Sequence, residues 1–317
     1  MTLPNITDYD HGISAIDAEY CRPGLAAIHL IVEGCTAALV DTGTSFSVPG
    51  VMEILCQRNI APESVSYIFL THIHLDHAGG AGEFMYRFPN ASLVVHPRAA
   101  RHMVDPTRLI ESAMAVYGEA KFKRMYGRIY PVKASRIIEA SDNFSINMSG
   151  RSLLFLDTPG HARHHYCIFD ETSRSFFTGD TFGVSYREFD VGGMEFVFPT
   201  TTPVQFDPVA AHISLDRIMS YNPQYAFLTH YSRIGNLIRH ASVMHDLIDA
   251  YVAIATKNYN QGSGRHVSLA RELGELLLQR IKVHGCTLPQ KKICELLNMD
   301  VNLNARGLES WLELTNK

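Results

Sequence analysis

The chain lacks several features that would assign it to a common class of protein. Its 317 residues carry 28 Lys+Arg against 32 Asp+Glu, a net charge of −4, so no broad positive field attracts nucleic acid or an anionic membrane. The first residues show no basic stretch followed by an apolar run, and no window approaches the roughly 18 apolar residues that span a bilayer. We therefore expect a soluble protein without a secretory signal, which acts on a small molecule.

Thiolate and nucleophile motifs are also absent. The six cysteines show no CxxC spacing, which argues against a thiolate zinc site, and a chain of this size needs no disulfide staples. Reduced thiols and a cytoplasmic location are therefore expected. Neither GxSxG nor GxxxxGKS/T occurs, which excludes a serine-hydrolase elbow and a phosphate-binding loop of that type.

The order of apolar runs predicts an α/β fold. Strands are expected within 25–42, 66–70, 93–95, 144–157, 165–170, 175–178 and 225–228, with helices near 48–59, 80–88, 98–126 and 207–220. Beyond residue 235 the apolar spacing becomes helical throughout. We expect a catalytic domain over 1–235 and a C-terminal α-helical region over 236–317, which serves as a cap or a dimerisation surface.

Histidine is abundant, with 16 copies, and several of them belong to polar clusters that directly follow predicted strands. Loops at one end of a sheet converge while the strands stay packed, so we expect the clusters to form one shared site. The clusters are Asp41-Thr-Gly43, Thr71-His-Ile-His-Leu-Asp-His77, Thr158-Pro-Gly-His161, Thr178-Gly-Asp180 and Leu228-Thr-His230.

The second cluster, HxHxDH, is the strongest signal. In an extended segment, alternate residues point the same way, so His72 and His74 can hold one ion while Asp76 and His77, past the bend, reach another. Neutral imidazole and carboxylate suit zinc, iron or manganese, and no cysteine is present among these residues. A dinuclear metal site is therefore expected.

With these residues the chain resembles the metallo-β-lactamase fold superfamily, over roughly residues 20 to 235. The resemblance implies an α/β fold, an αββα sandwich of the metallo-β-lactamase type, followed here by a C-terminal α-helical extension. It also implies two divalent metal ions per chain, zinc first, with iron or manganese as alternatives. The implied ligands are His72, His74 and His161 for one ion, Asp76, His77 and His230 for the other, and Asp180 as the bridge.

Two further residues take supporting roles in this resemblance. Asp41 would orient the HxHxDH loop, and His165 would lie behind the ligands. With His77 and a single bridging carboxylate, the chain is similar to the glyoxalase II-like hydrolases. The zinc lactamases that open antibiotics would instead be expected to have a cysteine ligand.

The implied activity is hydrolysis of an ester-like bond, a thioester or a lactone, by a metal-bridging hydroxide that the catalytic residues Asp76 and Asp180 orient. Three alternatives stay open. One is a non-haem iron oxidoreductase, such as a dioxygenase, on the same scaffold. The others are a phosphodiesterase or nuclease, and a binding protein with a vestigial site.

Six residues are expected at the substrate pocket. Arg163 and His164 stand where many relatives have proline and glycine, and a rich run of aromatic residues follows Asp180. A purely structural role is the alternative for each. The six are Arg163, His164, Phe182, Tyr186, Phe196 and Phe198. The helical segment near 98–130, with Met114, Tyr117, Met125 and Tyr126, is expected either to form the opposite wall or to pack into the core.

The last segment loosely resembles a helix-turn-helix, with helices over 290–298 and 302–311. DNA reading needs a clustered basic face on the second helix, and only Arg306 lies there before Glu309 and Glu313. No nucleic-acid partner is therefore expected, and a homodimer remains open.

Overall fold

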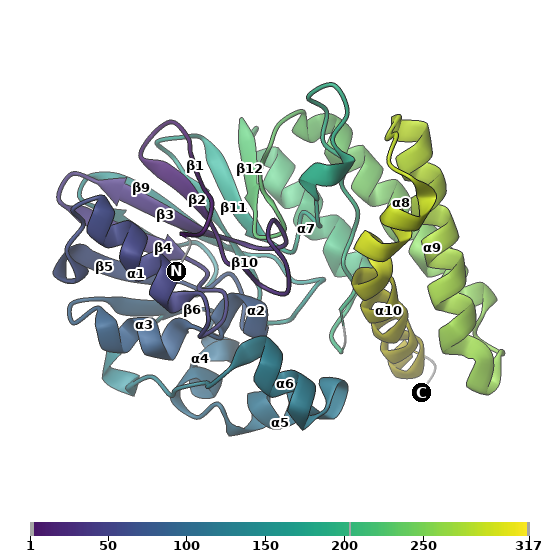
Figure 1. The fold of residues 1–317 in the computed structure, drawn as a ribbon, viewed down its shortest axis with the longest axis horizontal. Coiled ribbons are helices and arrows are strands. Elements are labelled where there is room, and N and C mark those ends of the chain that lie inside the picture. Colours follow the sequence, from purple (N-terminus) through teal and green to yellow (C-terminus); the bar gives the residue numbers. More distant parts are fainter. Residues whose placement is uncertain (1–2, 203, 316–317) are drawn as a thin grey trace. The chain divides into compact units, whose positions relative to one another are not determined.

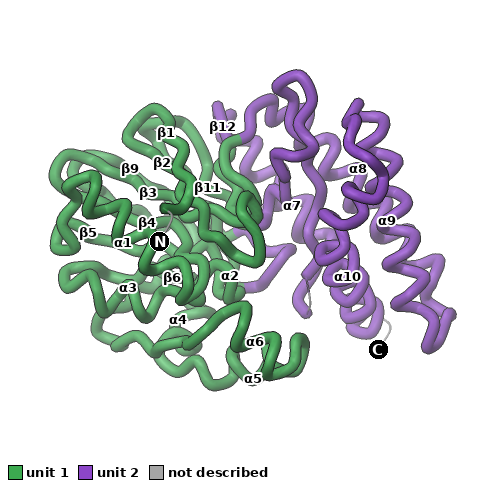
Figure 2. Tube along the Cα trace, viewed as in Figure 1, with its two compact units in different colours: residues 1–157, 164–179, 226–233 green, residues 158–163, 180–225, 234–317 purple. Residues whose placement is uncertain are grey.

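The computed structural model describes residues 3–202 and 204–315, drawn in Figure 1, and they form two compact units, coloured in Figure 2. The first unit comprises residues 1–157, 164–179 and 226–233, and the second comprises 158–163, 180–225 and 234–317. The domain boundary near residue 235 was predicted from the change to helical apolar spacing, whereas the two units reflect contacts in the folded chain. The boundary therefore stays a prediction.

The first unit contains a seven-stranded sheet in the order β1 to β7. Strands β1 to β4 are antiparallel neighbours, whereas β4 to β7 are parallel and need crossovers, which helices supply. The strands are β1 (Ile6–Asp8), β2 (Ile13–Asp17), β3 (Ala27–Glu33), β4 (Thr36–Val40), β5 (Val65–Phe69), β6 (Ser92–Val95) and β7 (Ile137–Glu139). The crossover helices are α1 (Val48–Gln57), α2 (Leu75–Ala78), α3 (Ala81–Arg87), α4 (Pro97–Val104), α5 (Thr107–Tyr117) and α6 (Glu119–Tyr126).

A second, six-stranded sheet has the order β13-β12-β11-β10-β9-β8. Antiparallel pairing joins β8 to β9, β9 to β10 and β10 to β11. The strands are β8 (Phe144–Met148), β9 (Arg151–Asp157), β10 (Tyr166–Asp170), β11 (Ser175–Gly179), β12 (Tyr225–Leu228) and β13 (Ser232–Ile234).

The core of the first unit lies between the inner faces of these sheets. Buried apolar residues of both sheets form one cluster, and Phe69 of β5 meets Phe155 of β9 edge to face, with ring centroids 5.4 Å apart. Helices α3 and α4 pack against β6 and β7, at the far side of the first sheet (Figure 1). The predicted α/β sandwich of two sheets flanked by helices, with C-terminal helices, is confirmed.

The second unit is built mainly from four helices: α7 (Pro208–Ser220), α8 (Leu237–Lys257), α9 (Arg265–His284) and α10 (Gln290–Thr315). Helix α9 buries Leu269, Leu273, Leu277 and Ile281, an i, i+4 stripe that packs against α8 and α10. Residues 258–264 separate α8 from α9, and α9 ends at His284, followed by Gly285, whose φ of +98° is left-handed. None of the described helices is long and apolar enough to cross a bilayer.

The predicted helix-turn-helix is wrong, because α10 runs without a break from Gln290 to Thr315. No glycine or proline stands between Asn298 and Asn302 to stop it. The Asn302 side-chain amide donates to the Asn298 carbonyl oxygen at 2.7 Å, one turn back, so the polar residues of this region stay within the helix. All six cysteines lie in the described residues and are free thiols.

We predict that His29 of β3 makes folding sensitive to acid. Burial lowers the pKa of this fully enclosed imidazole from 6.5 to about 4, although the nearby Asp41 charge opposes the shift. The unfolded chain therefore binds the extra proton between these pH values. The stabilising contribution is complete above about pH 6.5 and is lost as the pH falls toward 4.

The test compares the wild type with His29→Leu by urea unfolding at about pH 7.5 and about pH 5, where the histidine should account for about 2 kcal/mol of the lost free energy. The variant should lose correspondingly less between these two conditions. His266→Gln, which changes a partly exposed histidine, is the control and should keep the wild-type dependence. An equal loss in His29→Leu and the wild type would contradict the prediction.

Candidate metal centre

A buried carboxylate, Asp41, organises the strand ends of the first unit. It follows β4 directly, has a left-handed φ of +58° and is fully enclosed. Its oxygens accept hydrogen bonds from the Thr71 backbone N–H at 2.8 Å and from the Thr229 hydroxyl at 2.7 Å. The Thr71 hydroxyl adds a further donor at 2.9 Å. Asp41 therefore ties together the ends of β4, β5 and β12.

The fourth donor to Asp41 is the His77 ring, whose Nδ1 lies 2.8 Å from Oδ2. A carboxylate only accepts, so Nδ1 carries the proton and Nε2 keeps its lone pair for a metal. This Nε2 lies 3.8 Å from Asp76 Oδ2, and His230 Nε2 lies 3.3 Å from the same oxygen. His230 is oriented in the same way, because its Nδ1 donates to the Leu25 carbonyl oxygen at 2.7 Å.

Asp76, His77 and His230 thus form a group whose ligand atoms lie within 4.8 Å of one another, which is suited to one divalent ion. All three were predicted as the ligands of one ion. The sequence signal was their position just after β5 and β12, and the structure of the first unit brings them together.

The other half of the HxHxDH motif forms its own pair in the same unit. His72 Nε2 lies 2.9 Å from His74 Nδ1, so both rings present a nitrogen to the same point. His165 is fully buried and stacks on His72, with ring centroids 4.8 Å apart. The His164 ring lies 5.9 Å from the His74 ring. Both rings therefore lie beside the motif, and the predicted roles of His165 behind the ligands and of His164 at the substrate pocket stay predictions.

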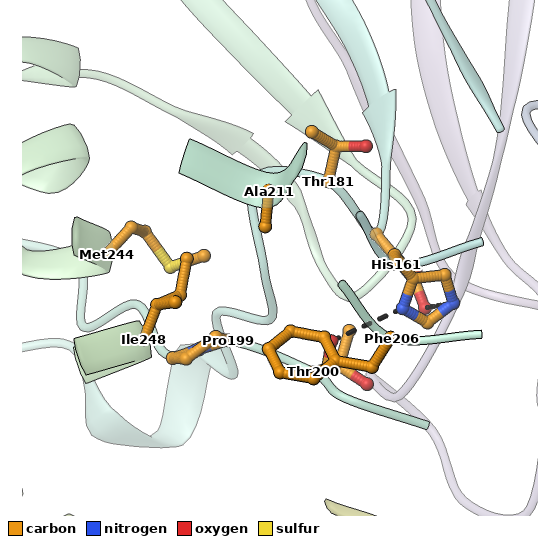
Figure 3. Close-up of a pocket in the computed structure, with 9 residues that line it drawn as sticks. His161, Thr181, Pro199, Thr200, Phe206, Ala211, Met244 and Ile248 are labelled. Atoms are coloured by element: carbon orange, nitrogen blue, oxygen red, sulfur yellow. Dashed lines mark hydrogen bonds and ion pairs between the residues drawn. The ribbon is translucent and has the colours of Figure 1, made fainter. Parts of the chain in front are cut away.

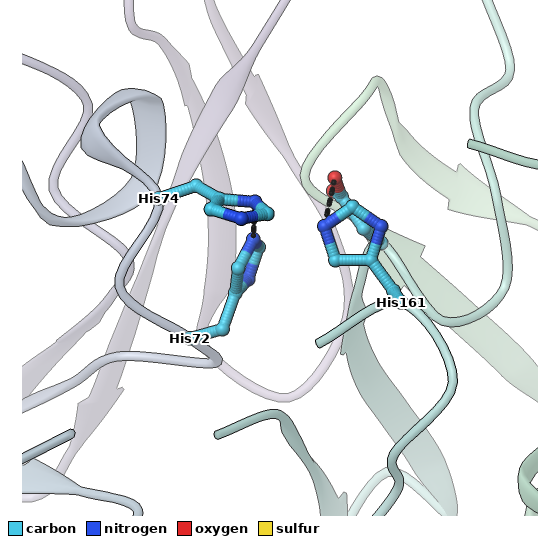
Figure 4. Close-up of side chains that lie close together, drawn as sticks. His72, His74 and His161 are labelled. Atoms are coloured by element: carbon cyan, nitrogen blue, oxygen red, sulfur yellow. Dashed lines mark hydrogen bonds and ion pairs between the residues drawn. The ribbon is translucent and has the colours of Figure 1, made fainter. Parts of the chain in front are cut away.

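In the second unit, His161 and Asp180 form the corresponding pair. His161 Nε2 lies 3.4 Å from Asp180 Oδ2, and its Nδ1 donates to the Thr200 carbonyl oxygen at 3.3 Å. Both side chains are buried. Figure 4 labels the rings of His72, His74 and His161, and its dashed lines mark the His72–His74 contact and the contact of His161 with a carboxylate oxygen of Asp180.

These residues fit divalent transition metals by the chemistry of their donors. They are imidazoles and carboxylates, and for His77, His161 and His230 an acceptor fixes Nδ1 as the protonated nitrogen. Such an acceptor behind the ring is the usual support of a metal-binding histidine. The identity and number of the ions stay predictions, as does the assignment of individual ligands.

A pocket in the second unit opens beside His161 and Asp180 (Figure 3). The space that its walls enclose is about that of one water molecule, and about 280 Å³ is free of atoms when the adjoining solvent is counted. Its walls are mostly apolar: Pro199, Phe206, Ala211, Met244 and Ile248, with Thr181 and Thr200 as polar additions. Sequence reasoning missed these residues, because they come from a loop and two helices that only tertiary packing joins.

None of the six residues predicted for the substrate pocket is among the lining residues of this cavity. Phe182, Tyr186, Phe196 and Phe198 are buried and pack within the aromatic loop, with Tyr186 and Phe198 rings 5.8 Å apart. Arg163 is exposed, and its backbone N–H donates to Gln205. Contact of the six with substrate therefore stays a prediction. In the segment near 98–130, Met125 and Tyr126 are buried, whereas Met114 and Tyr117 are half-buried, and both interpretations of the segment stay predictions.

Helix α10 supports the loop that forms one wall of the pocket. Asn304 accepts the Thr201 backbone N–H at 2.7 Å and donates to the Pro199 carbonyl oxygen at 3.2 Å. Gly307 lies so close that a Cβ atom there would be 1.4 Å from the Thr201 carbonyl oxygen. Because Thr200 also holds His161, α10 positions both the pocket wall and a candidate ligand. A glycine inside a helical pattern was the available signal.

A two-sheet α/β sandwich with histidine and aspartate ligands at its strand ends defines a class of metal-binding proteins. The family model described as the metallo-beta-lactamase superfamily matches residues 21–231, and the chain belongs to this superfamily. Its members bind divalent metals, and most are hydrolases. The glyoxalase II-like branch within it stays a prediction.

Three relatives illustrate the range of similarity. The metallo-beta-lactamase fold-containing protein ST1585 of Sulfurisphaera tokodaii is 25% identical over 89% of this chain and 97% of its own. Its crystal structure matches with a TM-score of 0.65, at 21% identity over 95% of this chain and 99% of that one. The acyl-coenzyme A thioesterase MBLAC2 of Homo sapiens is 28% identical over 53% of this chain and 63% of its own.

The third is a protein named thioesterase pkgB in Emericella nidulans, which is 27% identical over 56% of this chain and 44% of its own. The chain therefore matches less than two thirds of the length of either thioesterase-named relative.

We predict that Asp41→Asn weakens metal binding by about 10- to 100-fold, because the amide cannot accept every hydrogen bond and His77 loses its fixed orientation. Metal retained per chain is measured after dialysis against a graded series of chelator concentrations. Glu309→Gln is the matched control, since it changes a carboxylate that pairs with His266 elsewhere. Wild-type retention in Asp41→Asn would show that Asp41 does not support the ligands.

We also predict that Gly307→Ala destabilises the protein by about 2 kcal/mol, since the added methyl overlaps the Thr201 carbonyl. Gly274→Ala in α9 is the matched control, because its Cβ would meet nothing nearer than Val301 Cγ1 at 3.9 Å. That change should leave stability unchanged or raise it by up to about 1 kcal/mol. Urea unfolding measures both, and equal effects of the two substitutions would refute the role given to Gly307.

Proposed function

We propose that this protein is a dinuclear metal-dependent hydrolase of ester-like bonds, with thioesters as the first substrate class and lactones as the second. The observation that carries the proposal is the ligand set itself: buried imidazoles and carboxylates after strand ends, with supporting acceptors behind the rings. The thioesterase names of MBLAC2 and pkgB add support for the thioester.

In this proposal His72, His74 and His161 would hold one ion, Asp76, His77 and His230 would hold the other, and Asp180 would serve both. When bound, two divalent ions make water acidic enough to supply hydroxide near neutral pH and polarise a carbonyl oxygen. Zinc is the first candidate, and iron or manganese are the alternatives.

The groups around the ligands have separate tasks. The Asp41 carboxylate and the backbone carbonyls of Leu25 and Thr200 hold the rings of His77, His230 and His161 in fixed tautomers, which keeps a lone pair on each Nε2. Asp76 lies near two imidazoles, and about a fifth of its side chain is exposed. We assign it the task of orienting water and passing a proton to the leaving group, a thiol in the case of a thioester.

The apolar wall beside Asp180 supports an acyl group over a phosphate. Phe206, Met244 and Ile248 provide apolar surface beside Asp180, and the described lining contains no lysine or arginine. An acyl chain gains free energy by leaving water for such a surface, whereas a phosphodiester needs cationic partners. This contrast places the phosphodiesterase and nuclease alternatives behind the thioesterase.

The remaining parts of the proposal concern the metal and the partners. A non-haem iron oxidoreductase is the alternative activity, and metal analysis separates the two. We further propose a small-molecule substrate, a cytoplasmic location and, for the C-terminal helices, a supporting role beside the site. A homodimer stays an open alternative for those helices.

The deciding experiment measures hydrolysis of acyl thioesters, lactones and phosphodiesters together with metal content. We expect about two ions per chain and turnover of thioesters, which Asp180→Ala lowers by at least about 100-fold because the bridging carboxylate is lost. Glu313→Gln, on the exposed face of α10, is the control and keeps wild-type turnover. One iron with no second metal would favour the dioxygenase, and full turnover in folded Asp180→Ala would refute the bridge.

A further inference from the structure

Helices α7 and α8 of the second unit carry the same short pattern, a histidine followed four residues later by an aspartate. On α7 these are His212 and Asp216, and on α8 they are His245 and Asp249. Residues four apart share a helix face, so each pair projects from one side of its helix. The two pairs meet where the helices pack against each other.

Each histidine bonds the aspartate of the opposite helix. His212 Nε2 lies 3.2 Å from Asp249 Oδ1, and His245 Nε2 lies 3.2 Å from Asp216 Oδ1. This crossed pairing means that the helices run antiparallel at the contact. Because ionised carboxylates only accept, both Nε2 atoms are protonated donors.

Because Nε2 carries the proton, the Nδ1 atom of each ring is left as an acceptor. A neutral imidazole carries one N–H, so both Nδ1 atoms keep a lone pair, and they face each other at 2.6 Å. The rings are nearly parallel, at 4°, with centroids 4.9 Å apart. Two acceptors at this distance repel unless a cation is shared between them. A proton or a metal ion between the two Nδ1 atoms would remove this repulsion.

We propose that His212 and His245 form a surface site for a borderline divalent transition-metal ion such as Zn²⁺ or Ni²⁺, separate from the candidate metal centre. Imidazole nitrogen is a preferred ligand of these ions, whereas Mg²⁺ and Ca²⁺ need oxygen ligands. The carboxylates behind the rings supply the orientation that metal-binding histidines usually have.

The geometry requires only a small opening of the pair. Zinc–nitrogen bonds of about 2.0–2.1 Å in a tetrahedral site place two ligand nitrogens about 3.3 Å apart. The side chains of His212 and His245 are 27% and 28% exposed, so their rings have room to rotate apart and solvent can complete the coordination. The ion replaces the shared proton.

Three residues of the proposed site directly follow, in the sequence, residues that line the pocket. Ala211 precedes His212, Met244 precedes His245, and Ile248 precedes Asp249, and all three line the cavity. An ion held by both helices therefore fastens α7 to α8 where they border the pocket. Since the folded arrangement alone brings the two rings together, binding should also raise the melting temperature.

The test counts zinc per chain after equilibrium dialysis of the purified protein against a fixed, buffered zinc concentration. Wild type and the control His266→Gln, which removes a histidine that pairs with Glu309, should hold one more zinc than His212→Gln and His245→Gln. Asp249→Asn keeps both histidines and changes a side chain that is 77% exposed, and it should weaken this site about 10-fold.

Equal zinc content in all these proteins would overturn the proposal, because the shared cation would then be a proton only. So would an equal rise in melting temperature with zinc in the wild type and in His212→Gln. The difference of one ion does not depend on hydrolysis, since a failed dinuclear centre would lower the zinc content of every variant alike. If a histidine variant does not fold, Asp249→Asn decides, and unchanged zinc affinity there also overturns the proposal.

Discussion

The buried carboxylate of Asp41 is the interaction on which the first unit depends. An enclosed negative charge is costly unless every lone pair is satisfied, and Asp41 meets this condition with donors from Thr71, His77 and Thr229. These donors belong to strand ends and loops far apart in the sequence. The same contacts that stabilise the charge therefore bring the HxHxDH loop and the His230 loop to one place.

Sequence reasoning recovered most of this arrangement because its signals are local. Apolar runs predicted strands β3 to β6 and β8 to β12, and polar residues after those strands predicted His77 and His230 as neighbours. Strands β1 and β2 were missed, since residues 6–17 mix polar and apolar types without a clear period. The motif predicted that His72 and His74 face one point, because the spacing of histidines on an extended segment already fixes which rings share a direction.

The parts that sequence reasoning could not reach depend on packing between distant segments. The pocket lining of Phe206, Met244 and Ile248 results from how a loop and α8 meet, and no spacing along the chain encodes it. The helix-turn-helix prediction placed a break between residues 298 and 302, but helix continuity is the lower-energy choice when no breaker is present. The crossed His–Asp pairs needed both helices in place before their partners were visible.

The contact between Asn304 and Thr201 also has a consequence for the order in which the chain folds. These residues lie 103 positions apart, so the pocket loop and the support of His161 belong to a long-range contact. During synthesis, the HxHxDH segment leaves the ribosome far earlier than α10. The first unit can thus complete its strand-end ligands once residue 233 has been made, while the wall beside Asp180 gains its support only when nearly the whole chain is available. Assembly of the pocket is therefore a late event, and its apolar surface is exposed to other chains until then.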